Sequence, residues 1–349
     1  DSIQSTMLFS SFFVKITAEM TVAFLLLFLL SRIFFINSDP VFFDSPEYLT
    51  RLAEKDYINA ITSGHLPLHA GYIILFWPIY QASQSLGLNP ALVVIISQTI
   101  VATIAIFYFY LFIKIISDKT TAIYATLIAS TFPLFWVTNV TIMMETPYVS
   151  LFIISTYFLA RYASDKVPKK FHLIIAGNCL ALSFITHFGI VLWIPLLIYL
   201  SFFLNKTTFI KSTTSIIFAI VISSIINAYF IAIPNNINLY DGLIALYTAK
   251  LGEHAQFSLS IQSILIYIRN FMIPLFRNFT ILVVVLAFIS LIILFLKNKK
   301  LFFLSALWFV PSFIANQWWD SVLFGRHSLI AGFGLTFLAA NILKKNKIA

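Results

Sequence analysis

Long apolar runs separated by short polar segments dominate this chain. A bilayer-spanning helix needs about 20 mostly apolar residues. Ten runs reach or approach that length: 16–36, 91–113, 120–138, 147–162, 171–186, 188–204, 212–233, 279–296, 301–317 and 325–343. We therefore expect an all-α polytopic membrane protein with about ten transmembrane helices, forming one transmembrane domain over residues 1–349.

An eleventh stretch, 68–86, is apolar at its start but contains Pro78 and a polar tail from Gln81 to Ser85. The distribution of charge decides whether this stretch crosses the membrane, because cytoplasmic loops are enriched in Lys and Arg. With ten spans and both termini in the cytoplasm, the basic clusters at 114–119, 161–170, 206–211, 297–300 and 344–347 all fall inside. An eleventh full span would break this pattern. We interpret 68–86 as a re-entrant or surface-lying helix.

Most acidic residues fall on the opposite side of the membrane in this topology. The two substantial outer segments are 37–90, expected to hold amphipathic and re-entrant helices, and 234–278. The cytoplasmic loops are short and mostly basic. Any active site should therefore be extracytoplasmic.

Composition narrows the class of protein further. Hydrophobic residues make up 60% of the 349 residues and charged residues only 10%, against about 25% charged in a soluble domain. The lipid bilayer is the expected partner of this surface. The net charge of +9 does not indicate nucleic acid, because the basic residues sit in short clusters between spans. The single cysteine, Cys179, excludes disulfide staples and cysteine metal sites.

The first charged segment, "FFDSPEYLTRLAEKD" over 42–56, follows the first span and is expected to form one short helix. Ser45 suits the N-cap and Pro46 the first helical position. Glu47 is favourable near the positive end of the helix dipole. Asp44 is left without a structural role. A carboxylate at the membrane boundary is partly desolvated, which strengthens it as a general base.

A second outer acid, Glu145, occurs in "TNVTIMMETPYVSLF", where Pro147 begins the next span. It is either a helix-entry acid or a second catalytic carboxylate that acts on an acceptor hydroxyl or holds a metal. Both readings stay open.

Basic groups on the same face are candidates for binding phosphate, which Arg grips through paired hydrogen bonds. Arg326 and His327, in "LFGRHSLIAGFG", precede the last span. An outer-end arginine runs against the positive-inside bias, although it could also snorkel to the headgroups. Arg269 and Arg277 close the second outer segment, and His187 lies at the turn in "FITHFGIVLW".

His65 and His69 are four residues apart in "GHLPLHAGYIILF". This spacing can bind a metal on a helix, but Pro67 between them argues against one continuous helix. We expect them to shape a pocket. A divalent metal remains open, and no cofactor is certain.

These motifs resemble the GT-C superfamily of polytopic glycosyltransferases, in particular the branch of protein O-mannosyltransferases and the aminoarabinose transferase of lipid A. "FDSPEYL" is similar to the family's Asp-x-x-x-Tyr opening, and "GHLPLHAGYI" to its Pro-x-x-Tyr segment. The resemblance makes Glu47, Tyr48 and Tyr72 candidate substrate contacts. Three positions depart from the pattern: Ser45 replaces a second acid, His187 replaces a lysine or arginine, and His327 replaces the usual tyrosine after arginine.

The resemblance implies transfer of a sugar from a polyprenyl-phosphate carrier to an acceptor protein, lipid or glycan outside the cytoplasm, with inversion. The departing phosphate needs cationic stabilisation, and the acceptor hydroxyl needs a base. Arg326, with Arg269, Arg277 or His187, suits the first role. Asp44, assisted by Glu145, suits the second.

Two other functions remain alternatives. A transporter would place ionisable groups near the membrane midplane and often shows internal repeats, which this sequence lacks. A lipid-linked glycan flippase, a polymerase or a non-catalytic assembly subunit would tolerate loss of Asp44 or would use a lipid diphosphate.

Overall fold

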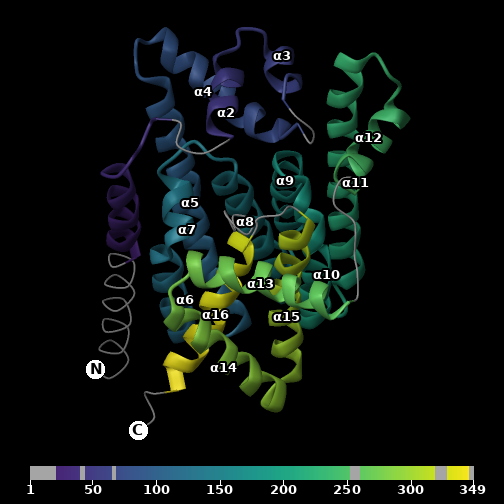
Figure 1. The fold of residues 1–349 in the computed structure, drawn as a ribbon. Coiled ribbons are helices and arrows are strands. Elements are labelled where there is room, and N and C mark those ends of the chain that lie inside the picture. The colour runs from purple at the N-terminus through teal and green to yellow at the C-terminus, as the bar shows by residue number, and fades with distance from the viewer. Residues whose placement is uncertain (1–20, 40–43, 65–67, 252–259, 319–327, 346–349) are drawn as a thin grey trace, which may run out of the picture.

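The structure is a computed structural model that describes residues 21–39, 44–64, 68–251, 260–318 and 328–345. Every regular element in these ranges is a helix, which confirms the all-α class (Figure 1). The elements are Thr21–Ile33, α2 Ser45–Ala53, α3 Tyr57–Thr62, α4 Ala70–Ser85, α5 Pro90–Ile116, α6 Lys119–Thr131, α7 Pro133–Asn139, α8 Glu145–Ser164, α9 Lys170–Thr186, η1 Phe188–Trp193, α10 Ile194–Leu204, α11 Phe209–Asn235, α12 Leu239–Leu251, α13 Ile261–Asn278, α14 Ile281–Lys297, α15 Lys299–Trp318 and α16 Leu329–Lys345.

The predicted apolar runs coincide with these helices. Among the described residues, α5 and α11 are long and apolar enough to cross a membrane by themselves, and the bent pair α6–α7 is a third candidate. Each of α5 and α11 has 27 residues, which corresponds to about 40 Å of helix against a hydrocarbon core of about 30 Å. The chain is therefore a membrane protein, while the count of ten spans and their orientation stay predictions.

The expected single span over 120–138 is broken. α6 and α7 meet at 60° between Thr131 and Pro133. Phe132 adopts an extended conformation (φ −72°, ψ 136°), because the residue before a proline is disfavoured in the helical region. The bend carries the end of α7 over α5, where the Thr99 hydroxyl donates to the carbonyl of Asn139 at 3.0 Å.

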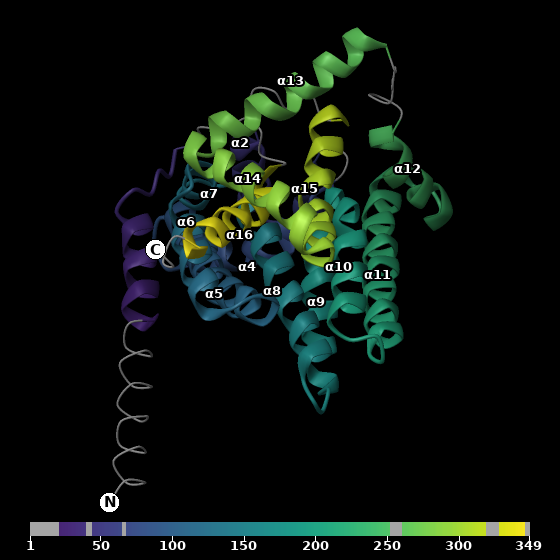
Figure 2. The ribbon, with the colours of Figure 1, turned by 90° about the horizontal axis from the view of Figure 1, so that it is seen from below.

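The helix α8 lies at the centre of the bundle and is buried along most of its length (Figure 2). Two serine hydroxyls join it to α9: Ser155 donates to the carbonyl of Ala176 at 2.8 Å, and Ser183 donates to that of Tyr148 at 2.7 Å. Small polar residues of this kind let helices approach closely within a bilayer.

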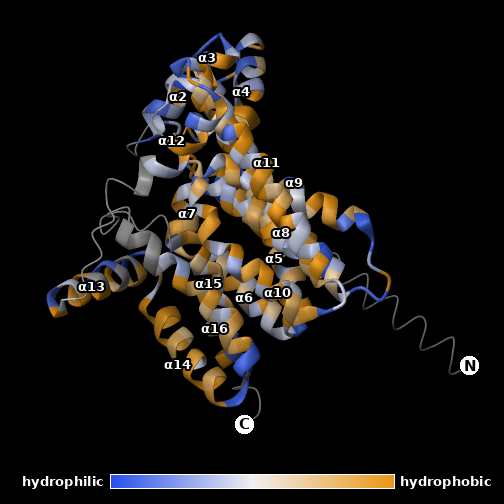
Figure 3. Ribbon diagram, turned by 90° about the vertical axis from the view of Figure 1, so that its right-hand side faces the viewer, coloured by the Kyte–Doolittle hydropathy of each residue, from blue (hydrophilic) through white to orange (hydrophobic). Residues whose placement is uncertain are grey.

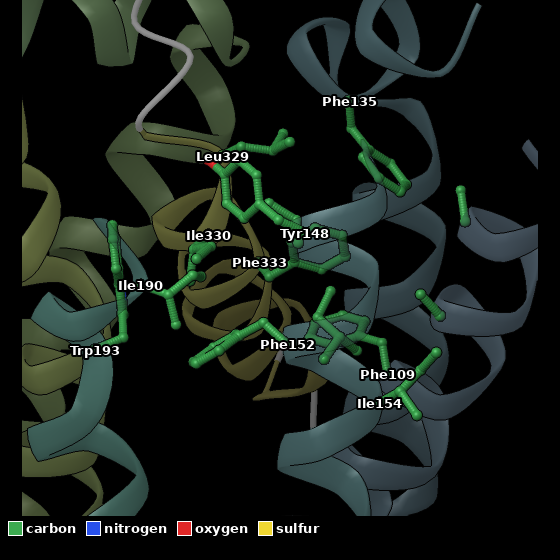
Figure 4. Close-up of a cluster of buried hydrophobic side chains, with 14 of the residues drawn as sticks. Phe109, Phe135, Tyr148, Phe152, Ile154, Ile190, Trp193, Leu329, Ile330 and Phe333 are labelled. Atoms are coloured by element: carbon green, nitrogen blue, oxygen red, sulfur yellow. The ribbon is translucent and has the colours of Figure 1, made fainter. Parts of the chain in front are cut away.

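Aromatic rings fill the core between α5, α7, α8 and α16 (Figure 4). Phe333 of α16 packs edge-on against Phe109 of α5 and Phe135 of α7, with ring centroids 4.9 and 5.1 Å apart. The Trp308 indole donates to the carbonyl of Ile330 at 2.9 Å. These contacts fix the last helix against the body of the bundle.

The helices α2, α3 and α4 form a cap at one end of the bundle. Arg51, buried in α2, donates to the carbonyls of Ala60, Ile61 and Leu68 at 2.7–2.9 Å. The expected single helix over 42–56 is corrected, because α2 ends at Ala53 and Asp56 caps α3 by accepting from the Asn59 amide. The cap folds as one unit around an arginine.

Basic turns gather at the end of the bundle opposite this cap. Lys344 at the end of α16 pairs with Asp118 between α5 and α6. The Tyr199 hydroxyl donates to the carbonyl of Lys300 at 3.2 Å. Figure 3 shows hydrophilic residues at both ends and hydrophobic residues along the helices between them. This separation agrees with a bundle whose middle part lies in the hydrocarbon core of a bilayer.

Candidate active site

Asp44 stands at the N-terminus of α2, at the edge of the cap. It is the N-cap residue, and its side chain is half-buried and does not cap the helix. The expected role of Ser45 as N-cap is wrong: Ser45 begins the helix, and its hydroxyl donates to the carbonyl of Ile142 at 2.7 Å. This bond fastens the start of α2 to the segment just before Glu145.

Glu145 is the first residue of α8 and is fully buried. A carboxylate is favoured here by the positive end of the helix dipole. The turn before it is held by the hydroxyl of Thr146, which donates to the carbonyl of Thr138 at 2.7 Å. The carboxylate lies within electrostatic range of the Tyr72 phenol on α4. Glu145 therefore lies near α4 of the cap.

Two histidines and a tyrosine stack at the same end of the bundle. The His187 ring, after α9, lies 4.6 Å from the Tyr148 ring and 5.7 Å from the His69 ring, nearly parallel to both. His69 adopts the left-handed conformation (φ 48°), and its Nδ1 contacts the carbonyl of Thr186 at 3.0 Å. This conformation is uncommon for a residue with a β-carbon, and such strain gathers at functional sites.

Two further rings join this stack to α2 and α4. The fully buried Tyr48 packs on Tyr72 with ring centroids 4.7 Å apart, and edge-on against His69 at 6.3 Å. The site thus combines buried carboxylate, imidazole and phenol groups from four helices. The carboxylates suit proton transfer, and imidazoles against aromatic faces are suited to carrying positive charge toward a phosphate.

The comparisons with known proteins bear on this site. Residues 73–230 match the family described as dolichyl-phosphate-mannose-protein mannosyltransferase. This part of the chain is similar to that family. The matched segment runs from α4 to α11 and contains Glu145, Tyr148 and His187, whereas Asp44 and His69 lie before it.

A solved structure shows the same fold as this mannosyltransferase-like chain. It is the apo crystal structure of the oligosaccharyltransferase of Archaeoglobus fulgidus, with a TM-score of 0.54 and 12% identity. The match covers 93% of this chain and 51% of the archaeal chain, so the present chain spans about half the length of that protein. No curated protein sequence matches the chain. The family match and the shared fold agree with the class expected from the sequence, a membrane glycosyltransferase of the GT-C type.

The remaining predicted residues fall elsewhere. Arg269 and Arg277 are exposed on α13, whose main contacts are with α14 and α15 (Figure 2). The Arg269 guanidinium donates to the Asn270 side chain at 3.2 Å. The half-buried Glu47 pairs with Arg51 at 3.5 Å. His65, Arg326 and His327 lie outside the described residues, so their roles stay predictions from sequence.

Sequence reasoning did not single out Gln98 or Tyr148, or give Arg51 a role. A signal existed for Gln98, because an amide inside an apolar run is costly and usually meets a specific need. Tyr148 gave no such signal, since tyrosine is ordinary at the end of a span. Within the described ranges, no three His, Cys, Asp or Glu side chains cluster closely enough to hold a metal.

Proposed function

We propose that this chain transfers a sugar from a polyprenyl-phosphate donor to an acceptor hydroxyl on the extracytoplasmic face of a membrane, with inversion at the anomeric carbon. The family match supports the donor class. The gathering of basic turns at the end opposite the cap supports the sidedness.

The observation that carries the proposal is the Ser45–Ile142 hydrogen bond. It joins the helix that begins after Asp44 to the segment that leads to Glu145, although these residues are about a hundred positions apart in the chain. This bond supports the placement of Asp44 and Glu145 at one site.

The reaction is a single displacement. The acceptor oxygen attacks the anomeric carbon, the bond from that carbon to the phosphate oxygen breaks, and the electron pair leaves with the polyprenyl phosphate. The acceptor proton passes to the carboxylate of Asp44, and Glu145 orients the acceptor. Attack from the face opposite the phosphate inverts the configuration.

The leaving phosphate needs positive charge and not a strong acid, because a phosphate monoester anion is already a weak base. His187 and His69 supply imidazoles at the inner wall of the site. Arg326 is proposed from sequence for the same task. The prenyl chain would remain in the bilayer, which explains a site built at the end of a membrane bundle.

The test uses proteoliposomes supplied with dolichyl phosphate mannose labelled in the sugar, and membrane protein and lipid fractions as acceptors. Asp44→Asn and Glu145→Gln should each lower transfer at least about 100-fold, the scale of a lost acid–base group. Arg326→Ala should weaken donor binding more than Asp44→Asn does. Wild-type turnover by the Asp44 variant would sink the assignment.

Glu54→Gln is the matched control, because Glu54 is an exposed acid in the same outer segment. It should leave transfer unchanged. A protein that carries labelled solute into vesicles without consuming the donor, and does so equally well with Asn at position 44, would instead be a transporter.

A further inference from the structure

Five consecutive backbone carbonyls precede Glu145, and each accepts a hydrogen bond from a different donor. Residues 138–142, here called the tethered segment, receive bonds from the Thr146 hydroxyl, the Thr99 hydroxyl, the Asn37 amide, the Gln98 side chain and the Ser45 hydroxyl, in that order, at 2.7–3.0 Å. The last carbonyls of α7 and those of the turn beyond it must find such partners where water is scarce. The segment is therefore held at every carbonyl.

Gln98 differs from the other donors because it reaches two parts of the site. It lies in α5 and is fully buried. Its Nε2 donates to the carbonyl of Thr141 at 3.0 Å, and its Oε1 accepts from the Tyr72 hydroxyl at 2.5 Å. A carbonyl cannot donate, so the amide nitrogen must face Thr141 and the amide oxygen must face Tyr72. The side chain has one orientation.

This arrangement determines the acceptor to which the Tyr72 hydroxyl donates its proton. A phenol has one O–H, and here it is committed to Gln98. The same phenol lies within electrostatic range of Glu145. Without Gln98, the hydroxyl is free to rotate, and the carbonyl of Thr141 loses its donor.

We propose that Gln98 is a positioning residue for sugar transfer, which holds the turn before Glu145 and the hydroxyl of Tyr72 in the arrangement that the reaction needs. The inference rests on the proposed role of Glu145. Gln98 acts through these two groups, and touches neither donor nor acceptor.

The principal test is Gln98→Met, which keeps the length of the side chain and removes both hydrogen bonds. Transfer from dolichyl phosphate mannose should fall in kcat by about 10- to 100-fold, the scale of lost outer-shell support or of a misplaced catalytic group. The KM for the donor should change less than about twofold on the same reasoning. Amide hydrogen exchange at 139–146 should accelerate.

Ser97→Ala is the matched control. Ser97 is the neighbouring residue on α5, and its hydroxyl donates to the carbonyl of Val93 in its own helix. Both kcat and exchange at 139–146 should remain as in the wild type. Tyr72→Phe separates the two bonds of Gln98: kcat should fall while exchange at 139–146 stays slow, because the bond to Thr141 remains.

A double-mutant comparison tests whether Gln98 acts through Glu145. In a Glu145→Asp background, Gln98→Met should cost less than about threefold, because residues that act as a unit are not additive. An equal loss in both backgrounds overturns the proposal. So does unchanged exchange at 139–146 in Gln98→Met, whatever the activity.

These results distinguish the proposed catalytic role of Glu145 from the proposed positioning role of Gln98. Full activity in Glu145→Gln would refute the catalytic role of Glu145 but leave the exchange result as evidence on the tethered segment. If Gln98→Met does not fold, Tyr72→Phe carries the test, and a wild-type kcat in that variant overturns the proposal.

Discussion

Replacing Arg51 with methionine should release the cap that carries Asp44 and His69. The guanidinium is 2% exposed and donates to three carbonyls of the cap, with Glu47 at 3.5 Å as its ion-pair partner. Burial lowers the pKa of Arg51, and Glu47 opposes that shift. Arginine nevertheless remains charged at neutral pH.

The magnitude follows from these bonds. A hydrogen bond to a charged group contributes about 1.5–3 kcal/mol, and three of them give a gross value of about 4–9 kcal/mol. Removing the charge also recovers its desolvation cost, so the net loss is nearer the 3–5 kcal/mol typical of breaking a buried charged pair. We expect about 3 kcal/mol, which is roughly a 100-fold change in the local opening equilibrium.

Hydrogen exchange of the amides in 57–64 measures this opening directly. Exchange in Arg51→Met should accelerate about 100-fold, in line with the local free energy above, and sugar transfer should fall with it. Arg161→Met is the matched control, because Arg161 is half-exposed and pairs with Asp165, one turn away, so it should shift exchange or stability by at most about 0.5 kcal/mol. A change in the Arg51 variant as small as in this control would refute the reasoning.

Three further predictions concern other parts of the fold. Partial desolvation acts to raise the pKa of Asp118, but the hydrogen bonds from Lys344 and Thr121 hold that pKa well below its usual range. The Asp118–Lys344 pair should therefore stabilise the fold by about 0.2–1 kcal/mol above pH 4, and this contribution should be lost as the pH falls further. Urea unfolding of Asp118→Asn and of the wild type would measure the difference. Gly71→Ala should cost about 1–3 kcal/mol and reduce transfer, because its β-carbon would lie 2.6 Å from the amide nitrogen of Thr186; thermal unfolding in detergent measures the cost. Trp308→Phe should cost about 1–2 kcal/mol in the same assay, because the hydrogen bond from the buried indole to the carbonyl of Ile330 in α16 is lost.

The elements of the fold were predictable because each apolar run is long and bounded by charge. The run 212–233, for example, corresponds to α11 at Phe209–Asn235. Predictions of helix breaks and of individual hydrogen bonds were less reliable. Pro133 signalled the break between α6 and α7, but an apolar pattern does not report a bend. Ser45 suited an N-cap by type, yet its hydroxyl found a carbonyl on a distant segment.

The candidate site was predictable only as a list of residue types on one side of the membrane. Glu145, His69 and His187 were identified because ionisable groups are conspicuous in an apolar chain. Their mutual placement was not visible, because it depends on ring contacts between residues more than a hundred positions apart, such as His69 and His187. The left-handed conformation of His69 could not be predicted from the sequence, because glycine or asparagine usually occupies such positions and His69 is neither.

The tethered segment explains why such a site can exist at the end of a membrane bundle. A catalytic carboxylate must be partly desolvated to act as a base, yet the irregular backbone that presents it would lose its hydrogen bonds in the same surroundings. Donors from α2, α5 and α8, together with the backbone amide of Asn37, resolve this conflict by meeting each carbonyl of 138–142. The rigidity of the turn is therefore a consequence of satisfying its backbone. On the proposed role of Glu145, loss of any one donor should therefore reduce sugar transfer before it affects the stability of the bundle.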